Sequence, residues 1–390
     1  MIEIQFWWLA ILPIFFGAGW LAARVDIKHV IAESHSLPIA YFKAVNHLLA
    51  GEMNKAIDIY IEIAKNHSET IELQVTLGHL FRRRGELERA IRMHQKILSR
   101  RDLSESQRQQ TQLDLAIDFI KSGLFDRAEK ILHDLSNTDS ARLARVELLA
   151  IYQQEHEWQK AIATAELLRD ESNSFQHEIA QFYCELASES LIRNQNEKAI
   201  NELNLALKEH RHSARARLML GEIALSEARP DEAIEHWLKM PAQDIHYLAL
   251  AARHLIAAYH SKNQLADGIA LLIRYVQQYP ELDVVDLIYE QLLATAGIDA
   301  AYDFVRERLR EHPSMPGLKK LLDAHLLVAP ADQKSELEVI GKLLHDNTRS
   351  YSMYYCSECG FKTRQFFWHC PGCNQWETYA PVRGKSRSVV

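Results

Sequence analysis

The chain has 390 residues, of which 47% are hydrophobic. It holds only 14 glycines and 10 prolines, the residues that punctuate folds rich in β-strands, so we expect an all-α body. The formal net charge of −7 argues against a broad nucleic-acid platform, because binding to phosphates needs a basic surface.

The first predicted element is a membrane anchor at the N-terminus. Ile4–Ala23 carry no charged side chain, and a helix of this length spans about 30 Å, the thickness of the hydrocarbon core of a bilayer. An acidic residue precedes this segment, whereas Arg24 and Lys28 follow it, so the positive-inside rule places the rest of the chain in the cytoplasm. A cleaved signal peptide is the alternative, but it would begin with positive charge and have a shorter apolar core. We therefore predict a transmembrane anchor at residues 1–24 and a juxtamembrane linker at residues 25–36.

Residues 37–348 have a periodic sequence. A small residue is followed four positions later by a bulkier or apolar one, and these pairs recur at intervals of 32 to 38 residues. The pairs are Ala56 with Tyr60, Ala90 with His94, Ala128 with Leu132, Ala161 with Ala165, Ala199 with Leu203, Ala233 with Trp237, Gly268 with Leu272, and Ala300 with Phe304. The expected turn residues, about five positions before the small residue, are Gly51, Gly85, Gly123, His156, Asn194, Ala228 and Asn263. The pattern predicts a succession of helix pairs joined by tight turns.

The clearest repeat runs from Leu77 to Leu98, with Gly78, Phe81, Gly85 and Ala90 at its key positions. This segment resembles the tetratricopeptide repeat family, whose unit is two antiparallel helices with small residues where the helices cross. A glycine or alanine at the crossing lets two backbones approach closely. The resemblance implies a superhelix of about eight repeats, with residues 317–345 as a terminal helix pair.

The C-terminal region contains two C-x-x-C pairs: Cys356 with Cys359, and Cys370 with Cys373. Each pair can form a tight turn that points two thiolates at one ion, so the four cysteines can make a tetrahedral metal site. We expect Gly360 and Gly372 to adopt backbone conformations that a Cβ disfavours. A pair of disulfides is the alternative, but a cytoplasmic chain faces a reducing environment.

The segment that contains the cysteines, residues 349–382, resembles rubredoxin and the rubredoxin-type zinc ribbons. Iron and zinc both accept four thiolates, but the short interval between the pairs, and Asn374 in place of a knuckle glycine, depart from the electron-transfer pattern. We therefore predict structural zinc, with iron as the alternative. His369 is expected to be an exposed neighbour of the site and not a ligand. The aromatic residues expected to cover the small core are Tyr354, Tyr355, Phe361, Phe366, Phe367, Trp368 and Trp376.

The sequence contains no motif of a zinc protease, a serine hydrolase or a phosphate-binding loop, so we predict a protein that binds and is not an enzyme. Cys184 lies among apolar residues and is expected to be a small buried helix residue, not a nucleophile. Two other functions stay open. A membrane-anchored electron carrier would hold iron, and a nucleic-acid-binding ribbon could use Arg364 and the basic tail at residues 383–390, which is more simply a solvated tail.

The order of anchor, repeats and four-cysteine domain resembles the lipopolysaccharide assembly protein B family of Gram-negative bacteria over essentially all 390 residues. The matching segments are Ile4–Ala23, Leu77–Leu98 and the cysteine-rich end. The resemblance implies a single-pass inner-membrane adaptor with a periplasmic N-terminus and a cytoplasmic body. It also implies that the protein promotes turnover of the lipid A pathway deacetylase by the membrane-bound AAA+ zinc protease, and that it associates with lipopolysaccharide export proteins. No nucleic-acid partner is expected.

Overall fold

The computed structural model describes residues 39–66, 70–170, 175–348, 354–379 and 381. The predicted anchor, the linker and the basic tail lie outside these residues. Among the residues described, no helix is long and apolar enough to cross a membrane. The chain divides into two compact units, Met1–Ile151 and Tyr152–Val390, and each is described by itself.

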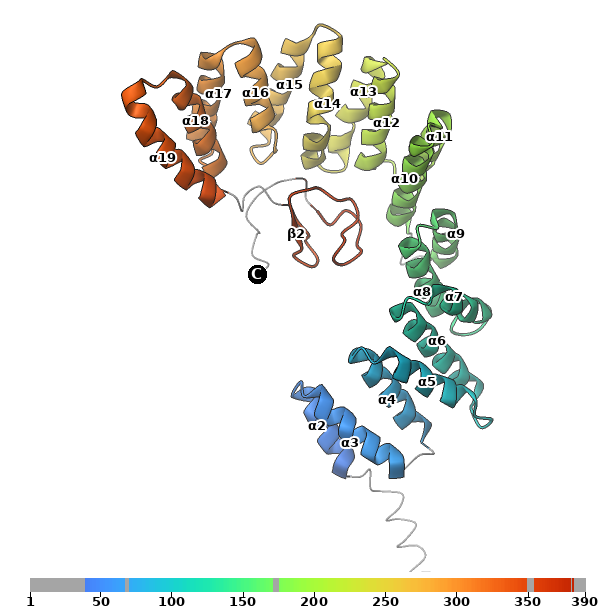
Figure 1. The fold of residues 1–390 in the computed structure, drawn as a ribbon. Helices are drawn as coiled ribbons and strands as arrows, with labels where there is room; N and C mark the ends of the chain where they lie inside the picture. Colours follow the sequence, from blue (N-terminus) through green and yellow to red (C-terminus); the bar gives the residue numbers. More distant parts are fainter. Residues whose placement is uncertain (1–38, 67–69, 171–174, 349–353, 380, 382–390) are drawn as a thin grey trace, which may run out of the picture. The chain divides into compact units, whose positions relative to one another are not determined.

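The first unit is built from helices that follow one another in pairs (Figure 1). Its helices are α2 (Ile39–Leu49), α3 (Met53–Asn66), α4 (Ile71–Arg83), α5 (Leu87–Leu98), α6 (Glu105–Lys121) and α7 (Phe125–Asp134), and α8 (Ala141–Gln154) continues into the second unit. Successive helices pack on one another and bury apolar residues such as Ile57, Tyr60 and Leu77.

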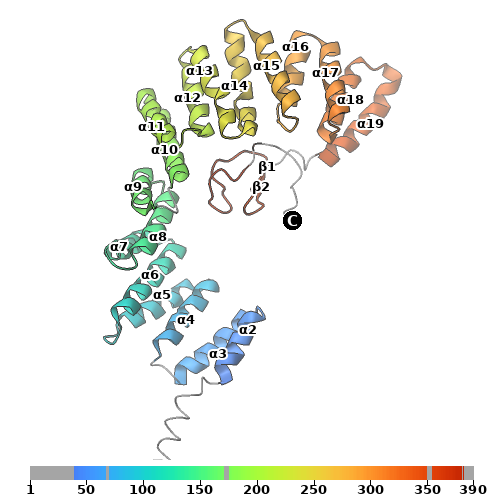
Figure 2. The ribbon, with the colours of Figure 1, turned by 180° about the vertical axis from the view of Figure 1, so that it is seen from behind.

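The second unit continues the helix pairs and ends in a small domain with little regular structure, visible beside the row of helices in Figures 1 and 2. Its helices are α9 (Trp158–Leu168), α10 (Gln176–Ile192), α11 (Asn196–Glu209), α12 (Ala214–Ser226), α13 (Pro230–Leu238), η2 (Met240–Ala242), η3 (Ile245–Tyr247), α14 (Leu248–Ser261), α15 (Leu265–Gln278), α16 (Val285–Thr295), α17 (Ile298–Glu311), α18 (Met315–Val328) and α19 (Ala331–Thr348). Strands β1 (Tyr354–Tyr355) and β2 (Lys362–Thr363) pair antiparallel, with Tyr354 opposite Thr363.

The mostly helical fold is confirmed, and so are the positions of the turns. Helices α2 to α17 form eight consecutive pairs, and α18 with α19 forms the terminal pair predicted for residues 317–345. All seven predicted turn residues have left-handed backbones, with φ from 56° to 82°. Four of them carry a Cβ: His156, Asn194, Ala228 and Asn263. The helix-turn-helix geometry therefore imposes this conformation even where no glycine is present to favour it.

Small residues lie where the two helices of a pair touch. The predicted small residues of the first seven pairs are buried. A Cβ added to Gly78 of α4 would lie 2.4 Å from His94 Nε2 of α5, and a Cβ added to Gly221 of α12 would lie 2.2 Å from Trp237 Nε1 of α13. These crossings accommodate a large ring on one helix only because the facing helix has no side chain at that point.

The eighth predicted pair, Ala300 with Phe304, is wrong by one residue. The buried residues are Ala301 and Val305, which are 0% and 1% exposed. Helix α17 begins directly after the turn residue Gly297, whereas one extra residue separates turn and helix in the earlier pairs. The shorter turn changes which face of the helix points inward, and the spacing of the other repeats does not reveal this change.

Candidate metal centre

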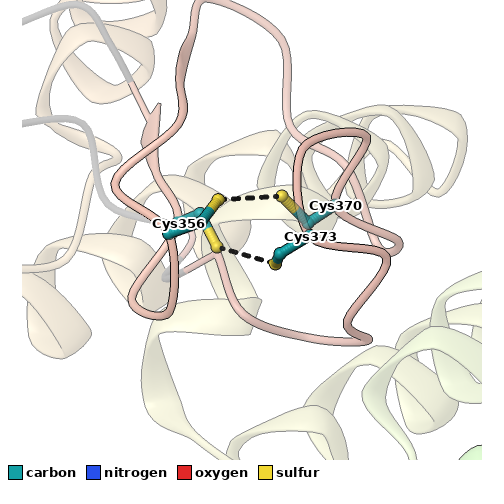
Figure 3. A group of neighbouring side chains, drawn as sticks. Cys356, Cys370 and Cys373 are labelled. Atoms are coloured by element: carbon teal, nitrogen blue, oxygen red, sulfur yellow. Dashed lines mark hydrogen bonds between the residues drawn. The ribbon is translucent and has the colours of Figure 1, made fainter. Parts of the chain in front are cut away.

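The four cysteines of the C-terminal domain form a group that can hold a metal ion. The Sγ atoms of Cys356 and Cys373 are 3.7 Å apart, and those of Cys359 and Cys370 are also 3.7 Å apart (Figure 3). These distances are too long for disulfides, which need sulfur atoms about 2 Å apart. They match the edges of about 3.8 Å that a tetrahedron of sulfurs has around an ion at about 2.3 Å. The donor set therefore fits a tetrahedral metal ion, and ligation by these four residues stays a prediction.

The two knuckles reach their shape in different ways. Gly360 has the expected left-handed backbone, with φ of 71°. The same expectation for Gly372 is wrong, because the left-handed residue of the second knuckle is Asn374, with φ of 57°, a conformation that asparagine tolerates. Gly372 instead provides space, since a Cβ there would lie 3.3 Å from Cys359 Sγ. Its backbone N–H donates to Cys370 Sγ at 3.4 Å.

The domain favours a thiolate on one cysteine of each pair. Burial alone raises the pKa of Cys356, but the Thr378 hydroxyl, 3.2 Å from its Sγ, and nearby backbone N–H groups outweigh burial and lower the pKa to about 6. Burial likewise raises the pKa of Cys370, but backbone N–H groups and the Tyr379 hydroxyl bring it below its usual value. Burial and the neighbouring thiols raise the pKa of Cys373 to about 12. Metal binding would therefore release protons from the remaining thiols.

The aromatic residues of the domain do not all serve its own core, contrary to the prediction. Tyr379 packs against the buried cysteines with Tyr354, Phe366 and Phe367 at its side. Phe361 is 43% exposed. The two tryptophans of the domain face the helices of the second unit and attach the domain to them.

Trp376 and Trp368 are the apolar part of this attachment. The Trp376 ring lies edge-on to Trp158 and Phe182, with ring centroids 6.2 and 6.0 Å away, and it is only 9% exposed. Trp368 stacks on Tyr247, with centroids 5.3 Å apart and an interplanar angle of 20°. Because buried aromatic pairs contribute about 0.5–1.5 kcal/mol beyond their burial, these contacts hold the domain against α9, α10 and η3.

Glu377 is the polar part of the attachment. Its side chain is 5% exposed, and its carboxylate accepts hydrogen bonds from His177 Nε2 at 2.6 Å, Gln181 Nε2 at 2.6 Å and Gln243 Nε2 at 2.5 Å. Gln181 in turn accepts a hydrogen bond from Arg215 at 3.2 Å. Three donors satisfy a carboxylate that would be costly to bury alone.

No sequence pattern indicates Glu377 or its partners, because these residues come from segments far apart along the chain. A left-handed φ of 50° at Glu377 turns its side chain to the helices, and no glycine or asparagine marks this position. His369 was expected to be exposed, but it is half-buried and stacks on Trp376 with centroids 4.3 Å apart. Cys184 is fully buried as predicted, and burial raises its pKa to about 12.

Comparisons with known proteins agree with this description. The rubredoxin metal binding domain family matches residues 354–381. Lipopolysaccharide assembly protein B of Escherichia coli (strain K12) is 32% identical over 388 residues, which are 98% of this chain and 99% of that protein. The protein of the same name from Haemophilus influenzae is 30% identical over 404 residues and 100% of both chains.

Similar solved structures include Naa15/Naa10 bound to HypK-THB, with a TM-score of 0.49, 16% identity, and coverage of 78% of this chain and 50% of that one. Another is the C-terminal part of a TPR repeat-containing protein from Cytophaga hutchinsonii, with a TM-score of 0.40, 12% identity, and coverage of 67% of this chain and 98% of that one. TM-scores below 0.5 and identities of 12% and 16% do not establish a shared fold.

The helix pairs and the four-cysteine domain define a helical-repeat protein with a C-terminal rubredoxin-type metal-binding domain. The identities over the full chain then settle the family. The chain belongs to the lipopolysaccharide assembly protein B family.

We expect the purified full-length protein to contain one zinc ion per chain in this domain, and Cys373→Ser to abolish that binding, because three thiolates leave the tetrahedron incomplete and folding of so small a domain is coupled to its metal. Elemental analysis gives the zinc content, and the loss of one ion per chain in Cys373→Ser assigns that ion to the domain. Cys184→Ala, which removes a cysteine outside the domain, should retain the ion. Stoichiometric iron in the wild-type protein would instead favour the electron carrier.

We expect the attachment of the domain to weaken as pH rises. The hydrogen bond with Glu377 raises the pKa of His177, so the stabilisation is present when His177 is protonated and is lost as pH rises through its raised pKa. The neighbouring His210 does not compete for this charge, because burial and His177 lower its pKa. Thermal unfolding of wild type and His177→Gln should differ at about pH 6 and converge at about pH 8.5. A difference that is independent of pH would contradict the role of charge here.

Proposed function

We propose that this protein is a single-pass inner-membrane adaptor that regulates lipopolysaccharide synthesis by binding. The observation that carries the proposal is the similarity over the full chain to proteins named for lipopolysaccharide assembly. The anchor at residues 1–24 would concentrate the cytoplasmic helix pairs beside membrane partners and so raise their effective concentration. Its client would be the lipid A pathway deacetylase, delivered to the membrane-bound AAA+ zinc protease. Contacts with lipopolysaccharide export proteins would link synthesis to export.

Two grooves on the helix pairs support a binding role. In the first unit, a groove of about 370 Å³ is lined by apolar residues that include Leu77, Phe81 and Met93, and by basic residues that include Arg89 and Lys96. This combination suits an amphipathic segment with an acidic edge.

The groove of the second unit has a volume of about 630 Å³ and lies between α15 and α16. Its lining includes Leu265, Ile269, Ile273 and Leu292, a largely apolar set that suits the hydrophobic face of a helix. Each unit therefore offers a separate candidate surface, as an adaptor between two proteins requires.

The metal-binding domain would support the adaptor role by offering partners a rigid surface, and not by catalysing a reaction at the metal. An ion held by four cysteines has no open position for a substrate or an activated water. Attachment through Trp376 and Glu377 fixes the surface of the domain relative to α10. A partner would therefore meet the domain and the adjacent helices as one surface.

The half-life of the deacetylase in cells tests the proposal. We expect Cys370→Ser to lengthen the half-life toward that seen without the adaptor, because loss of the metal unfolds the domain and removes its part of the partner surface. Pulse-chase immunoblotting measures the half-life, and the adaptor's own level is measured in the same samples.

Cys184→Ala is the matched control, because it also removes a buried cysteine but leaves the metal-binding domain intact; it should preserve rapid turnover. An unchanged half-life with Cys370→Ser would show that the domain has no part in delivery. An unchanged half-life after deletion of the whole gene would overturn the adaptor proposal itself.

A further inference from the structure

A second cluster of metal-binding side chains lies in the first unit, far along the chain from the cysteines. His79 of α4, His94 of α5 and Asp114 of α6 each place a ligand atom within 4.8 Å of the others. The three residues come from three consecutive helices. His94 is fully buried, Asp114 is 3% exposed, and the side chain of His79 is 43% exposed, which leaves the cluster accessible from one side.

Two ring nitrogens in this cluster lack a hydrogen bond. His94 Nε2 and His79 Nε2 are both buried atoms with no hydrogen-bond partner among the residues described. His79 Nε2 lies 2.8 Å from Asp114 Oδ1, but the contact is not aligned as a hydrogen bond. Because buried polar atoms are normally satisfied, an unsatisfied pair on two neighbouring histidines calls for a ligand.

The equivalent position of another repeat shows that the fold does not require a ring nitrogen without a hydrogen bond. Trp237 occupies the place of His94 in its own repeat, packed on Gly221 as His94 packs on Gly78. There the ring N–H donates to the Leu218 carbonyl at 3.1 Å. The helix pair can therefore satisfy a ring nitrogen at this position, and in the repeat of His94 it does not.

The neighbouring side chains orient His94 and add negative charge beside Nε2, and both effects favour the binding of a cation. Asp118 Oδ2 lies 2.6 Å from His94 Nδ1, so it accepts a hydrogen bond from Nδ1–H, and the lone pair of Nε2 stays available. Metal-bound histidines are typically oriented by such a carboxylate. Arg82 contacts Asp118 at 2.5 Å and Asp114 at 3.0 Å, so one guanidinium balances only one of two carboxylates. The remaining negative charge favours a cation.

Gln110 also approaches Asp114, with 3.5 Å between Nε2 and Oδ2. The Asp114 carboxylate, whose Oδ1 lies 2.8 Å from His79 Nε2, is placed to serve as an oxygen ligand.

We propose that His79, His94 and Asp114 bind a divalent transition-metal ion of the zinc type, with Asp118 as the carboxylate that orients His94. Two imidazole nitrogens and one carboxylate oxygen are a donor set that zinc and its neighbours accept. The ion would join α4, α5 and α6, and so clip two successive helix pairs together. The proposal is independent of the adaptor function, since it concerns a different unit and a different readout.

Titration with Co²⁺ tests the proposal, using full-length protein that holds one zinc ion per chain at the four cysteines after a weak chelator has removed any zinc from the His79 cluster. With the four cysteines occupied by zinc, we expect one equivalent of Co²⁺ to bind with the weak visible bands of nitrogen and oxygen ligands and without the intense bands of thiolate ligands. His79→Ala should abolish this equivalent. Asp118→Asn should weaken it by about 10- to 100-fold, the usual effect of losing an orienting carboxylate.

His254→Ala is the matched control, because His254 is 44% exposed and pairs with Glu222 at 3.3 Å, much as His79 pairs with Asp114. It should bind Co²⁺ like wild type. His79→Cys should restore binding and add a thiolate band, which would place residue 79 on the ion. Circular dichroism would check that each variant is folded. Absence of the extra equivalent in wild type, or its survival in His79→Ala, would overturn the proposal.

Discussion

The hydrogen bonds that the buried carboxylate of Glu377 accepts are the interaction on which the attachment of the metal-binding domain to the helix pairs depends. The carboxylate belongs to the metal-binding domain, but its hydrogen-bond donors belong to the helix pairs: His177 and Gln181 on α10, and Gln243 after η2. A carboxylate buried with three donors is stable only while all of them stay in place. Separating the domain from the helices therefore breaks these hydrogen bonds as well as the apolar contacts of Trp376.

This attachment connects metal binding to the binding surface. Glu377 is four residues beyond Cys373, and its position depends on a left-handed backbone that the folded domain imposes. A domain of this size holds its shape through its metal. By stabilising the fold of the domain, the metal would hold Trp376 and Glu377 in the positions from which they contact the helix pairs. The helix pairs themselves rest on small residues at the crossings, such as Gly221 beneath Trp237.

The features that a local sequence pattern determines, such as turns and cysteine pairs, can be predicted from the sequence. The features that arise only when helices from different repeats pack together cannot. Turns were found even at Ala228, because a five-residue offset to the next small residue recurs in every early repeat. The inward face of α17 was assigned wrongly, because one missing turn residue rotates a helix without changing its composition. The cysteine pairs were evident from spacing. Glu377 and the His79 cluster were not, since their members meet only after helices from different repeats have packed.

Hydrogen–deuterium exchange of the full-length protein, with metal bound and after chelation, tests most directly whether the metal-binding domain and the helix pairs behave as one body. Removal of the metal should accelerate exchange in α10 and in the segment around Gln243, where the partners of Glu377 lie, and should leave α18 unchanged. If chelation unfolds the C-terminal domain while α10 keeps its protection, the stability of α10 does not depend on the metal. That result would contradict the account in which metal binding stabilises the helices next to the domain.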